Sequence, residues 1–173
     1  RQCKFCAVPR TEGGFRELTG WLPGPIICDN NLTAASRQHF ERVIASVKHY
    51  DWVDFNQGLD ARLLKDWHID GLRELRLPHI RLAWDDIRSE AVIVDAVARL
   101  VRAGFSKRKI SLYVLVGYDE DIPATASYRC ESIRSWGMRP NVMRYQPLDC
   151  LVKNSYVAPN WDEKELKRFC RYW

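Results

Sequence analysis

The sequence predicts an α/β fold with parallel strands, and two observations support this prediction. Five strand-like runs recur at a nearly constant spacing, and helical patterns lie between them. The runs centre on Ile27, Phe55, Leu82, Tyr113 and Met143, which are 28, 27, 31 and 30 residues apart. One strand–helix unit needs about 30 residues. Strands that alternate with helices favour a parallel sheet, because the crossover helices cover its faces.

Each strand run is short and apolar, and the first helix has a clear pattern. The runs cover residues 25–28, 52–55, 80–84, 110–116 and 141–145. After the first run, Thr33 is predicted to cap a helix. The apolar stripe of that helix follows the i, i+3, i+4, i+7 pattern and consists of Phe40, Val43, Ile44 and Val47.

Four further helices are expected along the chain. The stretch 63–77 is helical by composition, although Gly71 interrupts it. The expected starts of the other three are Ser89, Asp121 with Pro123, and Asp162. Glycines that follow two of these helices mark their ends, at Gly104 and Gly137.

A sixth strand is expected ahead of Arg1, which would place Cys3 and Cys6 in the loop after it and give six units of an incomplete barrel. In α/β sheets the chemistry takes place beyond the carboxyl ends of the strands. The segments that follow the strand runs are rich in polar residues. They are 29–31, 56–60, 85–86, 117–120, and Gln146 with Asp149. These segments are therefore predicted to meet at one mouth.

Composition bounds the remaining possibilities. A chain of 173 residues, 46% hydrophobic, can bury one core, and we assign residues 1–150 to the core domain, with a loop at 1–10, and 151–173 to a truncated C-terminal extension. The net charge of +5 comes from dispersed residues and favours a mixed surface over a nucleic-acid interface. No apolar run reaches membrane-spanning length. The six cysteines, of which only the first two are close together, indicate reduced, cytoplasmic thiols. The other four are expected to be small buried side chains, at Cys28, Cys130, Cys150 and Cys170. The start at arginine indicates a fragment or a processed product.

The segment Cys3-Lys4-Phe5-Cys6 resembles the second half of the C-x3-C-x2-C motif of radical S-adenosylmethionine (SAM) enzymes, with Phe5 in the aromatic position. The resemblance implies a partial (β/α)6 TIM-like barrel whose first strand is missing or truncated here. It also implies a [4Fe–4S] cluster held by three thiolates, with Cys3 and Cys6 as two of them and the third two residues before Arg1. Zinc ribbons and thioredoxin-like sites share the C-x2-C spacing, but a second C-x2-C for zinc is missing.

The loop after the first strand run extends the resemblance. Asp29, Asn30 and Asn31 stand where many family members carry Gly-Gly-Glu, which accepts hydrogen bonds from the SAM ammonium. The alternative is that Asp29 and Asn30 form a turn ahead of the helix.

The segment 55–62, Phe-Asn-Gln-Gly-Leu-Asp-Ala-Arg, follows the second run with many polar side chains. The resemblance implies that Gln57, Asp60 and Arg62 reach toward the site, with Arg62 binding the SAM carboxylate through its planar guanidinium. The alternative is a local ion pair between Arg62 and Asp60.

Three later segments complete the expected SAM site. The run that ends at Val116 and Gly117 resembles the family segment that packs on the adenine, where glycine lets the backbone come close. Asp85 lies where an acceptor for a ribose hydroxyl often lies, and Gln146 belongs to the segment that meets the adenine edge. These roles follow from the resemblance alone.

The resemblance implies an enzyme with two cofactors, the [4Fe–4S] cluster and SAM. An electron from the reduced cluster would cleave SAM to methionine and a 5′-deoxyadenosyl radical, which abstracts hydrogen from a substrate that these motifs do not specify. The implied partners are SAM, that substrate, and an external electron donor such as flavodoxin or ferredoxin. The alternative function is a zinc-stabilised nucleic-acid-binding module that uses Cys3 and Cys6.

Overall fold

The computed structural model describes residues 3–173, and it is an α/β structure with parallel strands. Arg1 and Gln2, at the start of the predicted loop 1–10, lie outside the described residues, as does the expected preceding strand. Within 3–173, five strands form a two-stranded and a three-stranded sheet, and every pairing is parallel. The strands are β1 (Ile26–Ile27), β2 (Asp54–Phe55), β3 (Ile80–Ala83), β4 (Ile110–Val116) and β5 (Arg139–Arg144). The predicted positions of all five are confirmed.

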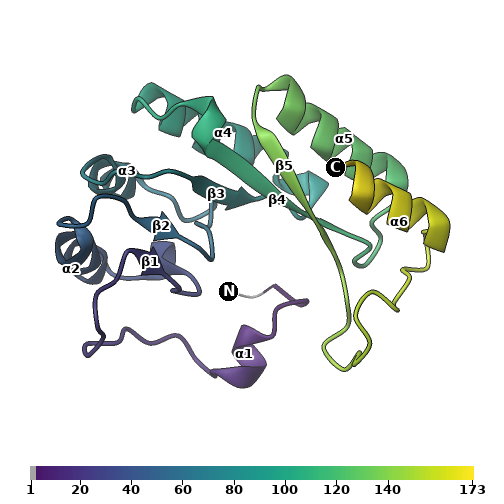
Figure 1. Cartoon of the computed structure of the whole chain (residues 1–173), viewed down its shortest axis with the longest axis horizontal. Coiled ribbons are helices and arrows are strands. Elements are labelled where there is room, and N and C mark those ends of the chain that lie inside the picture. Colours follow the sequence, from purple (N-terminus) through teal and green to yellow (C-terminus); the bar gives the residue numbers. More distant parts are fainter. Residues whose placement is uncertain (1–2) are drawn as a thin grey trace.

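The two sheets are joined edge to edge by a backbone contact. The Leu59 amide donates to the Arg81 carbonyl at 2.8 Å, and the Arg81 guanidinium forms an ion pair with Asp54 of β2. The strands therefore follow one another in chain order from β1 to β5, in an arc with helices on its outer side and the N-terminal segment on its inner side (Figure 1). Across the described residues the arc does not close into a barrel.

Helices follow each of the five strands. The α-helices are α1 (Val8–Thr11), α2 (Arg37–Val47), α3 (Asp66–Arg73), α4 (Glu90–Arg102), α5 (Pro123–Ser135) and α6 (Glu163–Tyr172). Short 3-10 turns are η1 (Leu32–Ala34), η2 (Ile87–Ser89) and η3 (Lys107–Lys109). The apolar stripe predicted for α2 is buried in full, which confirms its orientation.

The predicted cap of α2 was wrong by three residues, whereas α5 begins at Pro123 as predicted but with a different cap. Ser36, not Thr33, caps α2, and its hydroxyl accepts from the His39 amide at 3.2 Å. Thr33 lies in η1, where its hydroxyl donates to Asn31 and accepts from the Asp60 amide. The N-cap of α5 is Ile122, because the carboxylate of Asp121 is used by groups other than the first amides of the helix. Asp162 does cap α6 as predicted, accepting from the amides of the first turn.

The core lies between the strands and the outer helices. In β4, alternate residues are buried and the residues between them are half-buried, as the period of two in a strand requires. The buried set is Ile110, Leu112, Val114 and Val116. The α4 face predicted from its spacing, which includes Ile93 and Leu100, is buried as well.

Gly71 explains how α3 packs against α2. A Cβ at this position would lie 2.7 Å from Cε1 of Phe40, closer than side-chain carbons approach one another. The glycine that interrupts the predicted helix 63–77 therefore allows close helix packing, and α3 spans only Asp66–Arg73 of that stretch. Across residues 3–173, no helix combines the length and the apolar character needed to cross a membrane.

Candidate functional site

Cys3 and Cys6 lie on one tight turn that leads into α1. The Cys6 amide donates to the Cys3 carbonyl at 3.0 Å, which closes the turn. Both thiols are free and half-buried. The C-x2-C spacing occurs in zinc and iron–sulfur sites, where both thiolates bind the metal.

A chain of aromatic rings connects this turn to the carboxyl ends of β4 and β5. Phe5 packs edge-on against Tyr118 at 5.2 Å between ring centroids, and Tyr118 packs against Tyr145 at 4.8 Å. Tyr145 in turn contacts Tyr156 at 5.5 Å. Burial is the main cause that raises the pKa of Tyr118. We expected Phe5 from the sequence but not this chain of rings. The available signal was an aromatic residue within two positions of the end of each strand, Tyr118 after β4 and Tyr145 after β5.

A hydrogen-bonded network connects the same turn to the carboxyl ends of β1 and β2. Asn31 Oδ1 accepts from the Thr33 hydroxyl at 2.8 Å, and Thr33 Oγ1 accepts from the Asp60 amide at 3.2 Å. The Asp60 carboxylate holds the Arg62 guanidinium at 2.9 and 2.7 Å. A terminal nitrogen of Arg62 then lies 3.9 Å from the Cys3 sulfur. Loops from two neighbouring strands thus converge on the cysteine turn.

Arg62 forms the ion pair with Asp60 that was the alternative to a SAM contact, and the contact with the SAM carboxylate stays a prediction. The hydrogen bonds that the guanidinium donates to the Asp60 carboxylate are the main cause that raises the pKa of Arg62. The Asp60 side chain is 7% exposed, whereas the Arg62 side chain is 53% exposed. The guanidinium is therefore held in place at one edge and open to a ligand elsewhere. Gln57, from the same loop, is exposed.

Asp29 and Asn30 form the turn that the sequence offered as an alternative. Asp29 Oδ1 accepts from the Asn31 amide at 2.8 Å, and Asn30 Nδ2 donates to Glu12 Oε2 at 2.7 Å. The second bond ties the loop after β1 to the segment that follows the cysteine turn. Any SAM contact by Asp29, Asn30 and Asn31 stays a prediction.

A second Arg–Asp pair holds the ends of β3 and β4. The Arg129 guanidinium donates to the carbonyls of Trp84, Asp85 and Leu115 at 2.9, 3.0 and 3.1 Å, and it pairs with Asp121 at 2.6 Å. Asp85 Oδ1 accepts from the Leu115 amide at 3.1 Å. Asp85 therefore helps to hold the end of β4, and its contact with a ribose hydroxyl stays a prediction. No pattern in the sequence indicates a role for Arg129, because the carbonyls of Trp84 and Asp85 that it binds are distant along the chain.

Val116 and Gly117 end β4 next to the C-terminal segment. Val116 is buried, and Gly117 has a φ of 75°, which favours glycine. A Cβ on Gly117 would lie 3.3 Å from the Cβ of Ala158, and the Gly117 amide donates to Asp121 at 2.8 Å. The close approach at this glycine is thus to residue 158 of the chain, and an adenine contact stays a prediction.

Gln146 uses both ends of its side chain to hold the loop after β5. Its Nε2 donates to the Cys150 carbonyl at 3.1 Å, and its Oε1 accepts from the Asn154 amide at 2.7 Å.

Of the four dispersed cysteines, Cys130 is buried as predicted, but the prediction for Cys28 was wrong because its side chain is exposed. Cys28 lines a cavity beside β1 instead.

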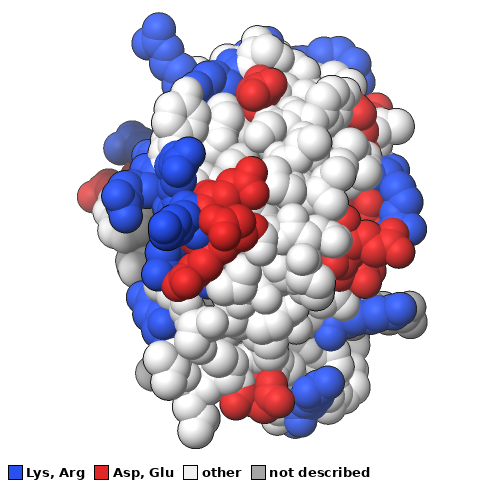
Figure 2. Space-filling model, turned by 90° about the vertical axis from the view of Figure 1, so that its right-hand side faces the viewer, with Lys and Arg blue, Asp and Glu red and all other residues white. Residues whose placement is uncertain are grey.

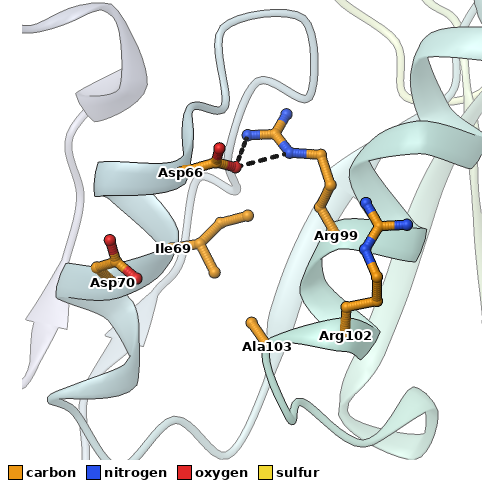
Figure 3. Close-up of a pocket in the computed structure, with 6 residues that line it drawn as sticks. All are labelled: Asp66, Ile69, Asp70, Arg99, Arg102 and Ala103. Carbon is orange, nitrogen blue, oxygen red and sulfur yellow. Dashed lines mark hydrogen bonds and ion pairs between the residues drawn. The ribbon is translucent and has the colours of Figure 1, made fainter.

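A hollow between α3 and α4 is a packing seam between two helices. Its volume is about 270 Å³, and Figure 3 shows Asp66 of α3 bound by two nitrogens of Arg99 of α4. Arg99 also donates to the Leu64 carbonyl at 2.8 Å. Since these bonds join neighbouring helices, we assign the hollow a structural role.

On the face of the molecule that Figure 2 shows, acidic and basic side chains lie side by side, as the dispersed charges in the sequence predicted.

No protein-family model, curated protein or solved structure matches this chain. Within residues 3–173, no group of three or more His, Cys, Asp or Glu side chains is placed to hold a metal ion. Cys3 and Cys6 supply two thiols on one turn, which fits two of the three ligands of a [4Fe–4S] cluster. The third ligand predicted for that cluster falls ahead of the described residues.

Proposed function

We propose that this chain is the core of a radical SAM enzyme. The observation that carries the proposal is the convergence on the cysteine turn, where Arg62 from the loop after β2 and Tyr118 from the loop after β4 meet Cys3 and Phe5. Chemistry in α/β folds takes place at the carboxyl ends of the strands, so a thiol pair at this edge is placed for function.

The proposed architecture is a partial (β/α)6 barrel. The parallel strands keep chain order, and β2 is bonded to β3 through Leu59 and Arg81. The helices lie on the outer side of the arc (Figure 1). A strand that precedes the cysteine turn would extend this arc and complete six units.

Cys3 and Cys6 would bind two irons of the [4Fe–4S] cluster as thiolates, with a third thiolate expected four residues before Cys3. When bound, the cluster supplies the electron that cleaves SAM to methionine and a 5′-deoxyadenosyl radical, which abstracts hydrogen from substrate. An external donor such as flavodoxin or ferredoxin would deliver that electron.

The residues of this chain would bind SAM and keep water out. Arg62 presents a planar guanidinium that can bind the SAM carboxylate with two parallel bonds, and Asp60 fixes its orientation. Phe5 and Tyr118 form an apolar wall beside the thiols, which limits solvent access and helps to set the reduction potential.

Anaerobic reconstitution with iron and sulfide tests the proposal. The protein used carries a cysteine four residues before Cys3, and we expect about four irons per chain with a broad brown absorption. With SAM and a reductant, we expect 5′-deoxyadenosine. Cys3→Ala and Cys6→Ala should each lose most of the iron and all of this product.

Cys150→Ser is the matched control, because Cys150 is also a half-buried free thiol but bonds only within its own loop among the described contacts. It should keep the full iron content. Stoichiometric zinc together with salt-dependent nucleic-acid binding would contradict the proposal and favour the zinc-stabilised module. Absence of any cluster after reconstitution would also contradict it.

A further inference from the structure

A cavity of about 760 Å³ lies between the segment that follows the cysteine turn and the β1–α2 unit. One wall is residues 8–24, and the other is the loop after β1 with the first half of α2, including Asn31 and His39. Its volume is in the range of small-molecule sites, which is roughly 300–1,000 Å³. None of the proposed cluster ligands lines it.

The rim of this cavity concentrates exposed apolar side chains. Phe15 is 62% exposed, Leu18 56%, Leu22 96% and Ile26 53%, and all four line the cavity. Trp21 lies deeper and packs on the ring of His39 at 5.5 Å. Apolar side chains that gather around a hollow, rather than scattering singly, indicate a binding surface.

The charged groups on the cavity walls are mainly acidic. Three carboxylates line it, Glu12, Glu17 and Asp29, against the single guanidinium of Arg16 among the described lining residues. Glu17 accepts from the Ser36 amide, and this hydrogen bond is the main cause that lowers its pKa, so it is ionised at neutral pH. The walls therefore carry an excess of negative charge.

One buried donor on the wall lacks a partner. Asn31 is 5% exposed and lines the cavity, and its Nδ2 has no hydrogen-bond partner among the described residues. A buried amide nitrogen without a partner destabilises the fold, and an acceptor on a bound molecule would remove that cost. An acceptor on a ligand could bind this nitrogen in addition to the contact between a positive charge and the carboxylates.

We propose that this cavity binds an organic amine, with its ammonium toward the carboxylates of Glu12, Glu17 and Asp29 and its apolar body against Trp21 and the rim. The charge excess selects a cation, and the apolar rim and the volume select an organic one rather than a metal ion.

The amine is the class of substrate for the reaction, an assignment that rests on the proposed function. Asp29, Asn30 and Asn31 belong both to the cavity wall and to the loop predicted to meet SAM. A molecule in the cavity would thus lie next to SAM, where a hydrogen atom must be abstracted. The binding itself needs neither cluster nor SAM.

Calorimetry with three probes of matched size tests the binding. The probes are 2-phenylethylamine, 2-phenylethanol and 3-phenylpropionate, which differ in charge but share an apolar ring. Titrated into the 173-residue chain without iron, the amine should bind about tenfold more tightly than the alcohol. The carboxylate should bind most weakly.

Glu12→Gln is the informative variant, because its amide oxygen can still accept from Asn30 while the charge is lost. It should weaken amine binding about three- to tenfold and leave the alcohol unchanged. Glu131→Gln, an exposed charge on α5, is the matched control and should leave both unchanged.

Several results would overturn the inference. Binding of the carboxylate as tight as that of the amine, equal effects of the two glutamine variants, or no binding of any probe would each do so. Displacement of 2-phenylethylamine by SAM would show that the cavity is part of the SAM site instead of a separate substrate site. Failure of cluster reconstitution alone would overturn the proposed function and leave amine binding standing.

Discussion

The two halves of the molecule each hold their strand ends with an Arg–Asp pair, but the two pairs differ in burial. Arg129 and Asp121, at the ends of β3 and β4, have side chains 1% and 10% exposed. Arg62 and Asp60, at the end of β2, have side chains 53% and 7% exposed. The same pair of residue types is enclosed in one half and open on its arginine side in the other.

The partners of each guanidinium explain the difference. Arg129 donates hydrogen bonds to four backbone carbonyls and to Asp121, so it fixes the shape of the strand ends. Arg62 bonds to Asp60 and then faces the Cys3 sulfur. We therefore expect the first pair to determine stability and the second to determine binding.

Arg129→Met should give the largest effect. It leaves the Asp121 carboxylate without its guanidinium and removes the donor from four carbonyls, including those of Trp84 and Leu115. Loss of one partner from a buried ion pair costs about 3–5 kcal/mol. Urea unfolding followed by circular dichroism measures the change.

Arg102→Met is the control for Arg129, because Arg102 is exposed at the end of α4. It should change the free energy of unfolding by less than about 0.5 kcal/mol. An Arg129→Met protein that loses no more than this control would show that the buried network does not hold the strand ends.

Acid should weaken the β1–β2 half through His68 of α3. Burial, followed by the charges of Lys65 and Arg99, lowers the pKa of His68 from 6.5 to about 4. Above pH 6.5 the imidazole is neutral in both the folded and the unfolded chain. Between pH 6.5 and pH 4 the unfolded chain binds a proton that the folded chain does not, so stability falls with falling pH, by up to about 3 kcal/mol.

His68→Gln removes this contribution while keeping a side chain that can accept from the Lys65 amide, as His68 Nδ1 does at 2.9 Å. The difference in unfolding free energy between pH 7 and pH 4.5 should therefore be smaller in the variant. Hydrogen exchange in the unchanged protein should show α2 and α3 losing protection before α5 at pH 4.5. Equal pH dependence in both proteins would exclude His68 as the cause.

Gly71→Ala should cause an intermediate loss in the same half. Alanine is more favourable than glycine inside a helix by about 1 kcal/mol. However, its Cβ would lie 2.7 Å from Cε1 of the Phe40 ring. Overpacking of this kind costs about 1–3 kcal/mol, so we expect net destabilisation in urea. Asp70→Ala, at the exposed neighbour, is the control and should be nearly neutral. A stabilised Gly71→Ala protein would mean that α2 and α3 separate easily.

Local patterns in the sequence were enough to predict the strands and most helices. The apolar run 110–116 and the stripe of α2 depend on residues within one element, and both are confirmed. The networks could not be predicted in this way. Arg129 bonds to Trp84, 45 positions away, and the segment 8–24 forms a cavity wall without any periodic pattern.

The candidate site was predictable to the extent that it depends on strand order. Parallel strands bring the loops after β1, β2 and β4 to one edge, so Arg62 and the cysteine turn were expected to meet, and they do. A side chain at this edge remains open to a ligand only if it is not already hydrogen-bonded to the rest of the chain, and strand order does not determine this. Gln146 is occupied at both ends by its own loop, a fact that no residue type or spacing indicates.

Arg62→Met should have the smallest effect on stability and the clearest effect on binding. Because its guanidinium is half exposed, we expect a loss of less than about 1 kcal/mol in urea. In the reconstituted protein, affinity for SAM should fall at least about tenfold, the cost of a lost charge-assisted bond. Arg62→Lys keeps the positive charge but loses the planar guanidinium, so its affinity for SAM should lie between those of the unchanged protein and Arg62→Met. If SAM affinity is unchanged in Arg62→Met, this arginine serves only to hold Asp60, and the two pairs differ in burial but not in role.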